Sequence, residues 1–217
     1  MKRIFFNILA AAIIAALFSV KTAIAGQMTI KFQPGSDFRV KIGLAGSGTF
    51  SIDWGDKDSE KSTYEFDGGC ELDDFTYYGY IYLSTSVRTV IITGQNVTSL
   101  DCSAISLISL DVSSNPTLMV LWCAYSQLTA LDVSRNTALK SLDCSQNQLM
   151  TLDVSHNTSI EILNCSQNRL TTLDVSQNKS LAELHCSNNR LTALDVSRNT
   201  ALKALSYDKD SVKIIPR

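Results

Sequence analysis

The sequence has few prolines, which interrupt regular secondary structure, and few histidines, which often carry out acid–base chemistry. Its 217 residues include three prolines and two histidines, and no low-complexity stretch interrupts them. Scarce proline without compositional bias is typical of an ordered chain. The formal net charge is −2, with neither a basic patch nor a basic helix. This balance argues against partners such as nucleic acid or an anionic membrane surface.

Catalytic motifs are also missing from the sequence. It contains no GxSxG elbow, phosphate loop or HExxH motif, and no carboxylate pair of the kind used in acid–base catalysis. The many serines recur as rows of equivalent residues, whereas a nucleophile needs a dedicated base. We therefore expect that the protein is not an enzyme and has no catalytic residue, cofactor or metal site.

Residues 1–25 have the three parts of an export signal. Lys2 and Arg3 precede an apolar run from Ile4 to Val20, and small residues end at Ala25. The alternative is a retained membrane anchor, but the run is near the lower limit of about 20 residues that a bilayer requires. We favour cleavage after Ala25, with no membrane insertion afterwards. Loss of the three basic residues of this segment leaves 16 basic and 21 acidic residues, a net charge of −5. The protein is then exported: secreted, at the cell surface or in the periplasm.

Residues 97–207 repeat with a period of 21. Leu128 to Gln148 reads LTALDVSRNTALKSLDCSQNQ, and each of the next two rows differs from it at nine positions but keeps the LDVSxN and CSxN motifs. Each row holds the pattern LxxLxCxxNxL followed by a similar half ending in LDVSxN. Three columns return without a slip: Cys102, Cys123, Cys144, Cys165 and Cys186; Val112, Val133, Val154, Val175 and Val196; Asp111, Asp132, Asp153, Asp174 and Asp195. Such periodicity is the signature of a solenoid.

The pattern resembles the irregular, nested 21-residue class of leucine-rich repeats. It is most similar to internalin J-like bacterial surface proteins, which share a ladder of cysteines and the LDVSxN half-repeat. The resemblance covers about residues 97–207. It implies a right-handed solenoid and a role in adhesion or host interaction. No LPxTG-type sorting tail follows the array, so the sequence does not predict attachment to a cell wall.

Elementary packing leads to the same architecture. The Leu-x-Cys and Leu-x-Val segments alternate with the period of a strand, so Leu, Cys and Val point inward. A single 21-residue coil cannot bury its own apolar edge, so the coils must stack. We expect a β-dominated solenoid with two strand-like segments per coil and little helix. The Asn of each half-repeat follows a strand, where its amide can pair turn backbone groups. We expect this structural role for Asn136, Asn157 and Asn178.

The six cysteines of an exported protein suggest disulfides. Five of them, however, occupy one inward ladder position, where neighbouring side chains point in parallel and suit the geometry of the bond poorly. We favour reduced cysteines packed in the core. A flat ladder without a CxxC motif also gives no tetrahedral cage for zinc. Cys70 lies outside the array, and its role and pairing stay open.

Residues 26–96 predict a small β-rich N-terminal cap. Phe38–Leu44 and Phe50–Trp54 alternate on either side of a glycine-rich turn, which predicts a β-hairpin. Tyr77–Leu83 and Arg88–Thr93 predict two further strands. Residues 52–56, IDWGD, resemble the WDFGDG turn of polycystic-kidney-disease-type β-sandwich domains, although Lys57 replaces the second glycine, so a sandwich is one possible form. The cap would cover the open edge of the first coil, and residues 208–217 would form a short polar C-terminal cap.

The column of aspartates is electrostatically unfavourable. At a spacing of ~4.8 Å, neighbouring carboxylates repel by about 0.9 kcal/mol even in water. Either each Asp accepts hydrogen bonds from the following Ser and turn N–H groups, or divalent cations lie along the row. We favour the hydrogen bonds, because no calcium-binding Gly-x-Asp turn is present.

A partner should bind where outward columns vary. The outer surface of the Leu-x-Val segments, the Leu-x-Val face, hardly changes from coil to coil. The outer surface of the Leu-x-Cys segments, the Leu-x-Cys face, varies; one of its columns runs from Val120 to Ala204. Drift on a solvated surface would produce the same variation. Because aromatic side chains are favoured at interfaces, we predict a partner-binding site at Trp122, Tyr125, Asp143, Asn164, Glu183 and His185. The partner would be a protein or a glycan; an inert structural spacer in the envelope is the alternative.

Overall fold

The computed structural model describes residues 26–34, 39–55, 62–65, 75–82 and 85–216. The predicted export signal and Cys70 lie outside these residues. Secondary structure in the described part of the chain consists of strands alone, as expected, and none of it forms a helix long and apolar enough to cross a membrane. The strands are β1 (Gln27–Phe32), β2 (Arg39–Gly46), β3 (Thr49–Asp53), β4 (Ser62–Glu65), β5 (Thr76–Ile81), β6 (Arg88–Thr93), β7 (Val97–Asp101), β8 (Leu107–Asp111), β9 (Val120–Trp122), β10 (Ser141–Asp143), β11 (Ile162–Asn164), β12 (Glu183–His185), β13 (Ala193–Asp195), β14 (Ala204–Ser206) and β15 (Lys213–Ile215).

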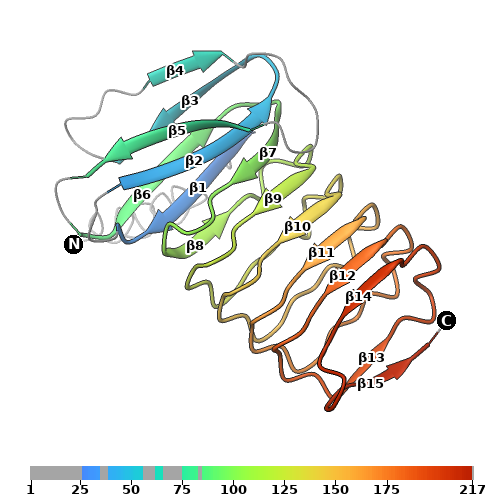
Figure 1. Ribbon diagram of the computed structural model, residues 1–217. Helices are drawn as coiled ribbons and strands as arrows, with labels where there is room; N and C mark the ends of the chain where they lie inside the picture. The colour runs from blue at the N-terminus through green and yellow to red at the C-terminus, as the bar shows by residue number, and fades with distance from the viewer. Residues whose placement is uncertain (1–25, 35–38, 56–61, 66–74, 83–84, 217) are drawn as a thin grey trace, which may run out of the picture.

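The repeats form the predicted β-solenoid, whose coils stack along one axis (Figure 1). Each coil contributes one Leu-x-Cys strand to a parallel ladder of β7, β9, β10, β11, β12 and β14. The register follows the period, because Leu142 lies opposite Leu121 and Leu163. The Leu, Cys and Val columns fill the interior, where Leu142, Cys144 and Val154 have no exposed surface. Each coil therefore covers the apolar edge of the next.

Of the two strand-like segments expected in each coil, those on the Leu-x-Val side form regular strands only at the ends of the array, in β8 and β13. Residues 131–133, 152–154 and 173–175 lie in the right order along the coils but are not assigned as strands. Their carbonyl groups have other partners: the Val133 carbonyl oxygen accepts the backbone N–H of Asn136 and the side-chain amide of Asn157. Since asparagine side chains link the coils here, this side holds together without a continuous strand ladder.

The N-terminal cap continues both sides of the solenoid. β2 pairs antiparallel with β7, and β1 pairs antiparallel with β8, so the first coil has no open edge at these strands. β5 then adds to β2, which gives an eight-stranded sheet in the order β14-β12-β11-β10-β9-β7-β2-β5. The second sheet of the cap has the order β4-β3-β6-β1-β8. Between the two sheets, the ring of Phe50 stacks on Tyr64 and meets Tyr78 edge-on.

The predicted hairpin of Phe38–Leu44 and Phe50–Trp54 is wrong, although both segments are strands. β2 lies in the eight-stranded sheet and β3 in the five-stranded sheet. β2 has β5 and β7 as its neighbours, whereas β3 lies between β4 and β6. Residues with no exposed surface, such as Ile42 on β2 and Ile52 on β3, face the interior between the sheets. The short connection therefore crosses from one layer to the other.

The C-terminal segment adds a strand rather than only polar residues. β15 pairs in parallel with β13 and extends the Leu-x-Val side by one segment. The last coil has no following coil to accept its backbone hydrogen bonds, and Asp208 takes this role. Its carboxylate oxygens accept the N–H groups of Asn188 at 2.9 Å and Asn189 at 3.3 Å. In the preceding coils a serine carbonyl oxygen takes the first of these bonds, as Ser187 does for Gln167.

Candidate binding surface

The outer surface of the eight-stranded sheet carries one continuous row of side chains. Strand register places one residue of each strand directly opposite the next, from β5 of the cap to β14 of the last coil. The row consists of Tyr77, Gly43, Asp101, Trp122, Asp143, Asn164, His185 and Ser206. The predicted site residues of the Leu-x-Cys face therefore lie on a surface that the cap extends by two strands.

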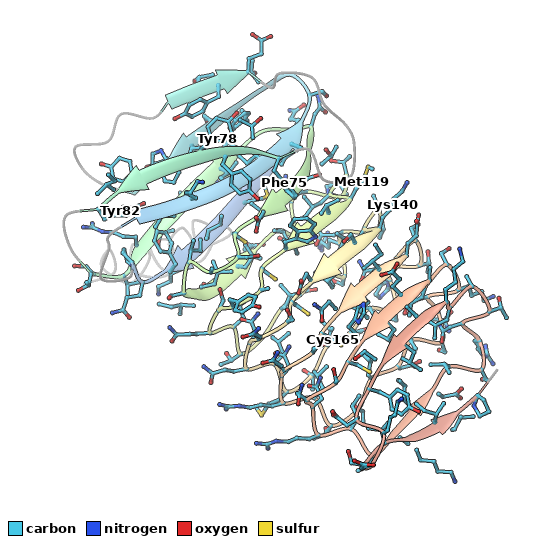
Figure 2. All side chains as sticks on the ribbon, in the orientation of Figure 1. Phe75, Tyr78, Tyr82, Met119, Lys140 and Cys165 are labelled. Carbon is cyan, nitrogen blue, oxygen red and sulfur yellow. The ribbon has the colours of Figure 1, made fainter. Side chains whose placement is uncertain are left out.

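Gly43 is the one member of this row without a side chain, and two aromatic rings use the space above it. A Cβ atom at this position would lie 2.9 Å from the ring of Tyr77 and 3.1 Å from the ring of Phe75. The hydroxyl group of Tyr77 reaches across β2 and donates to Asp101 Oδ2 at 2.8 Å. The ring of Phe75 contacts Trp122, with centroids 4.9 Å apart. Figure 2 shows Phe75 where the cap meets the array.

Trp122 is therefore a junction residue rather than a fully outward one. Its indole is partly covered by Phe75, and its Nε1 donates to Ser141 Oγ at 3.4 Å. The Nζ atom of Lys41 also lies over the ring of Tyr77, 5.2 Å from its centroid. Desolvation, followed by the hydrogen bond to Asp101 and the charge of this carboxylate, raises the pKa of Tyr77 to about 12. The phenol therefore stays protonated and keeps its donor role at neutral pH.

Tyr125 is the most exposed aromatic side chain of the predicted site, with 61% of its surface accessible. Its backbone has a φ of 53°, in the left-handed region, which is uncommon for residues other than glycine. Gln146, Gln167 and Asn188 occupy the same place in later coils and share this conformation. The turn is held by inter-coil bonds, since the N–H of Tyr125 donates to the carbonyl oxygen of Ser145 at 3.1 Å. It presents this column of side chains to solvent beside the sheet.

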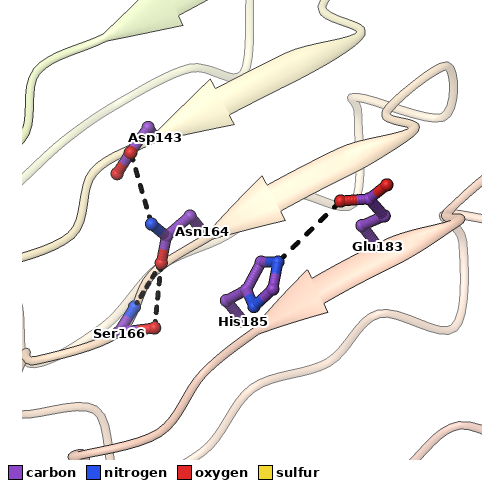
Figure 3. Close-up of polar contacts among 5 residues, drawn as sticks. All are labelled: Asp143, Asn164, Ser166, Glu183 and His185. Atoms are coloured by element: carbon purple, nitrogen blue, oxygen red, sulfur yellow. Dashed lines mark hydrogen bonds and ion pairs between the residues drawn. The ribbon is translucent and has the colours of Figure 1, made fainter. Parts of the chain in front are cut away.

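The centre of the row is polar (Figure 3). The amide of Asn164 donates to Asp143 Oδ2 at 3.2 Å, and its Oδ1 accepts the hydroxyl of Ser166 at 2.9 Å. His185 Nε2 lies 3.9 Å from Glu183 Oε2 on the same strand. The structure thus brings Asp143 and Asn164 into contact, and Glu183 close to His185. Both hydrogen-bond donors and hydrogen-bond acceptors line this part of the surface.

A second outward row runs beside the first, and its first repeat member departs from the expectation. Val120 was expected to point outward, but it is fully buried. The register places Ser99, Val120, Ser141, Ile162, Glu183 and Ala204 opposite one another. Further along the row Ile162 is 40% exposed and Glu183 is exposed. The accessible part of the face therefore begins beyond the cap.

The opposite face, the Leu-x-Val face, carries the row of aspartates, and serines donate hydrogen bonds to their carboxylates. In each coil, Oδ1 of the aspartate accepts the backbone N–H of the serine two residues later, at 2.8–3.0 Å. For Asp153, the side-chain and backbone hydrogen bonds of Ser155 hold the carboxyl pKa below its usual value, with a smaller effect from His156. These contacts agree with the favoured explanation, in which local hydrogen bonds offset the repulsion between neighbouring aspartates.

The five ladder cysteines lie inside the solenoid as free thiols. At most 1% of their surface is exposed, and burial raises the pKa of each thiol; for Cys186, desolvation and the nearby Asp208 raise it to about 12. Cys102 and Cys186 direct Sγ at carbonyl oxygens of the next coil, Trp122 and Ser206. Their environment suits packing and disfavours the reactive thiolate.

Three residues of this surface are not apparent from the repeat: Phe75, Tyr77 and Asp101. The sequence holds one signal for them, a glycine inside the alternating segment of β2, which is typical of a close approach by another group. The sequence does not indicate which side chains approach it, because β5 follows β2 at a distance in the chain.

Comparison with known proteins supports the fold of the array. The functional domain of InlJ from Listeria monocytogenes, which includes a cysteine ladder, is similar to this chain with 40% sequence identity and a TM-score of 0.51. The similarity covers 52% of this chain and 25% of that one, so the chain corresponds to about a quarter of the InlJ structure. An internalin, InlF, from the same species has 21% identity and a TM-score of 0.41 over 48% of this chain and 32% of its own. No protein-family model and no curated protein sequence matches the chain.

Proposed function

We propose that this internalin-like leucine-rich-repeat chain is an exported, non-enzymatic binding protein that recognises a protein partner through its Leu-x-Cys face. The observation that carries the proposal is the contrast between the two faces. The Leu-x-Val face repeats one Asp–Ser contact in every coil. On the Leu-x-Cys face, the row from Trp122 to Ser206 changes in every coil, from an aromatic to an acidic, an amide, an imidazole and a hydroxyl side chain.

The accessible part of the face has the composition of a recognition surface. Tyr125 and Ile162 are 61% and 40% exposed, and Asp143, Asn164 and Glu183 supply polar groups beside them. Interfaces place large anchors among polar groups, and truncating a central anchor typically costs about 2 kcal/mol or more. A rigid sheet also loses little entropy when it binds. The likeness to the InlJ functional domain supports a role in protein–protein interaction; an adhesive or host-directed role outside the cytoplasm is the finer form of this proposal.

The test compares two faces of one coil. Ile162 precedes the inward Leu163 on the Leu-x-Cys face, and Thr172 precedes the inward Leu173 on the Leu-x-Val face; both are exposed. Ile162→Lys and Thr172→Lys are therefore matched substitutions at equivalent places in the two half-repeats. Tyr125→Ala adds a second probe of the Leu-x-Cys face and leaves the Phe75–Trp122 contact intact.

The immobilised protein is presented to an array of purified extracellular and cell-surface proteins and, separately, to a glycan array. We expect saturable binding to a protein, weakened at least about 10-fold by Ile162→Lys and Tyr125→Ala. Thr172→Lys should bind as the wild type does, and all variants should unfold at the same temperature. Loss of binding in Thr172→Lys alone would contradict the assignment of the face. Binding to glycans alone would show that the partner is a glycan and not a protein. No binding on either array would favour an inert spacer.

A further inference from the structure

The eight-stranded sheet ends in two edges of different character. At the array end, β14 has three residues and is followed closely by the charged residues Asp208, Lys209 and Asp210. At the cap end, β5 has six residues, TYYGYI, with neither charge nor proline. Among the described residues only β2 pairs with β5. Long, apolar edge strands present unpaired N–H and C=O groups that template pairing with another strand, and charges or short length normally prevent this.

The outward side chains of β5 are large and apolar on either side of a glycine. Tyr77 is 48% exposed and Ile81 is 61% exposed, while Gly79 lies between them on the same side of the strand. Tyr78 and Tyr80 point to the other side, toward the interior of the cap, where Tyr80 stacks on Trp54. The outward side of this strand therefore presents the exposed ring of Tyr77, whose hydroxyl donates to Asp101, and the exposed apolar Ile81, equally spaced from Gly79.

This spacing makes the strand complementary to itself. In an antiparallel pair centred on Gly79, Tyr77 of one copy lies opposite Ile81 of the other, twice over. Opposite residues in such a pair point to the same side, with Cβ atoms about 4.5–5.5 Å apart, and aromatic–aliphatic pairs of this kind are stabilising. We propose that β5 pairs with β5 of a second copy of this chain, forming a two-fold symmetric dimer whose axis passes between the two Gly79 residues, perpendicular to the sheet.

The dimer would join two eight-stranded sheets into one. Because the axis is perpendicular to the sheet, both Leu-x-Cys faces lie on the same side, and the two arrays extend away from the junction in opposite directions. A six-residue strand pair is small compared with a stable interface, so we expect reversible association at micromolar concentrations. Two faces in one particle would raise the avidity for a surface that displays many copies of a partner. The pairing itself does not depend on the proposed function.

Sedimentation velocity of the purified protein tests the association. Ile81→Lys places a charge on the edge, and Met150→Lys is the matched control, since Met150 is 62% exposed in the repeat array. We expect the wild type and Met150→Lys to dimerise as concentration rises, and Ile81→Lys to dimerise at least about 10-fold more weakly. A wild type that stays monomeric up to hundreds of micromolar, or equal association of Ile81→Lys, would overturn the proposal.

Cross-linking tests the register in a Cys70→Ser background. Tyr77→Cys and Ile81→Cys lie opposite each other only between two copies, at a separation within reach of a disulfide. A mixture of the two variants should therefore form a disulfide-linked dimer under mild oxidation several-fold faster than either variant alone. Equal cross-linking of one variant with itself would refute the register centred on Gly79.

Discussion

The two rows of buried asparagines should differ in what they contribute to stability, although the sequence presents them as equivalents. Asn147 follows a Leu-x-Cys segment, and Asn157 follows the next Leu-x-Val segment. Oδ1 of Asn147 accepts the backbone N–H of Leu128 at 2.9 Å, and its amide donates to the carbonyl oxygen of Cys123 at 2.9 Å. The amide of Asn157 donates to the carbonyl oxygens of two residues of the preceding coil, and its Oδ1 is buried without a hydrogen-bond partner.

Replacement by alanine therefore leaves different groups unpaired. In Asn147→Ala, the N–H of Leu128 loses its acceptor inside the protein. In Asn157→Ala, both carbonyl groups keep a backbone donor, namely the N–H of Asn136 for Val133 and the N–H of Leu139 for Asn136. A buried polar group without a partner costs about 1–3 kcal/mol, whereas a hydrogen bond between satisfied groups contributes about 0.5–1.5 kcal/mol net. Asn157→Ala also removes a buried oxygen that has no partner.

We expect Asn147→Ala to lower the free energy of unfolding by about 2 kcal/mol more than Asn157→Ala. For a chain of this size, that difference corresponds to roughly 4–8 °C in the unfolding midpoint. Thermal and urea unfolding followed by circular dichroism measure it, with Gln148→Ala, a partly exposed neighbour, as the reference near zero. Equal losses, or a larger loss for Asn157→Ala, would refute the reasoning from unpaired backbone groups.

Gly43→Ala should displace the ring of Phe75, because the new Cβ would lie 3.1 Å from it, and the fluorescence of Trp122 should then become more accessible to iodide quenching; unchanged quenching would contradict the proposed packing. Ser155→Ala should raise the carboxyl pKa of Asp153, which NMR titration measures, because the serine hydrogen bonds lower that pKa below 3.8 in the folded protein. The stability from this carboxylate is present above its unfolded pKa and is lost as the pH falls through the lower folded value, so the variant should lose less stability between neutral pH and about pH 3. The ladder thiols should resist iodoacetamide at pH 8 until the protein unfolds, because they are buried with raised pKa values; native mass spectrometry should find at most the one label of Cys70, and further labels in the folded protein would show that the ladder opens.

Much of the array follows from the sequence. The 21-residue period brings the same residue types to the same place in every coil, so the direction of each side chain repeats with it. The inward Leu, Cys and Val, the buried Asn and the parallel register could all be predicted, because a coil that cannot bury its own apolar edge has to stack. The proposed binding face was chosen from the outward columns that vary, and it stays a prediction.

Long-range pairing decided the rest, and only the tertiary structure provides it. β2 and β3 alternate as a hairpin would, yet they enter different sheets, because β2 pairs with β7 of the first coil. The pairing of β5 with β2 brings Phe75 beside Trp122 and partly covers an indole that the repeat alone would expose. The sequence by itself determined the coil and which of its side chains point inward, because local alternation encodes both. Only the fold determined which strands the cap covers and that β5 lies at the end of the eight-stranded sheet. Hydrogen bonds between strands that are distant in the chain have no local signal in the sequence.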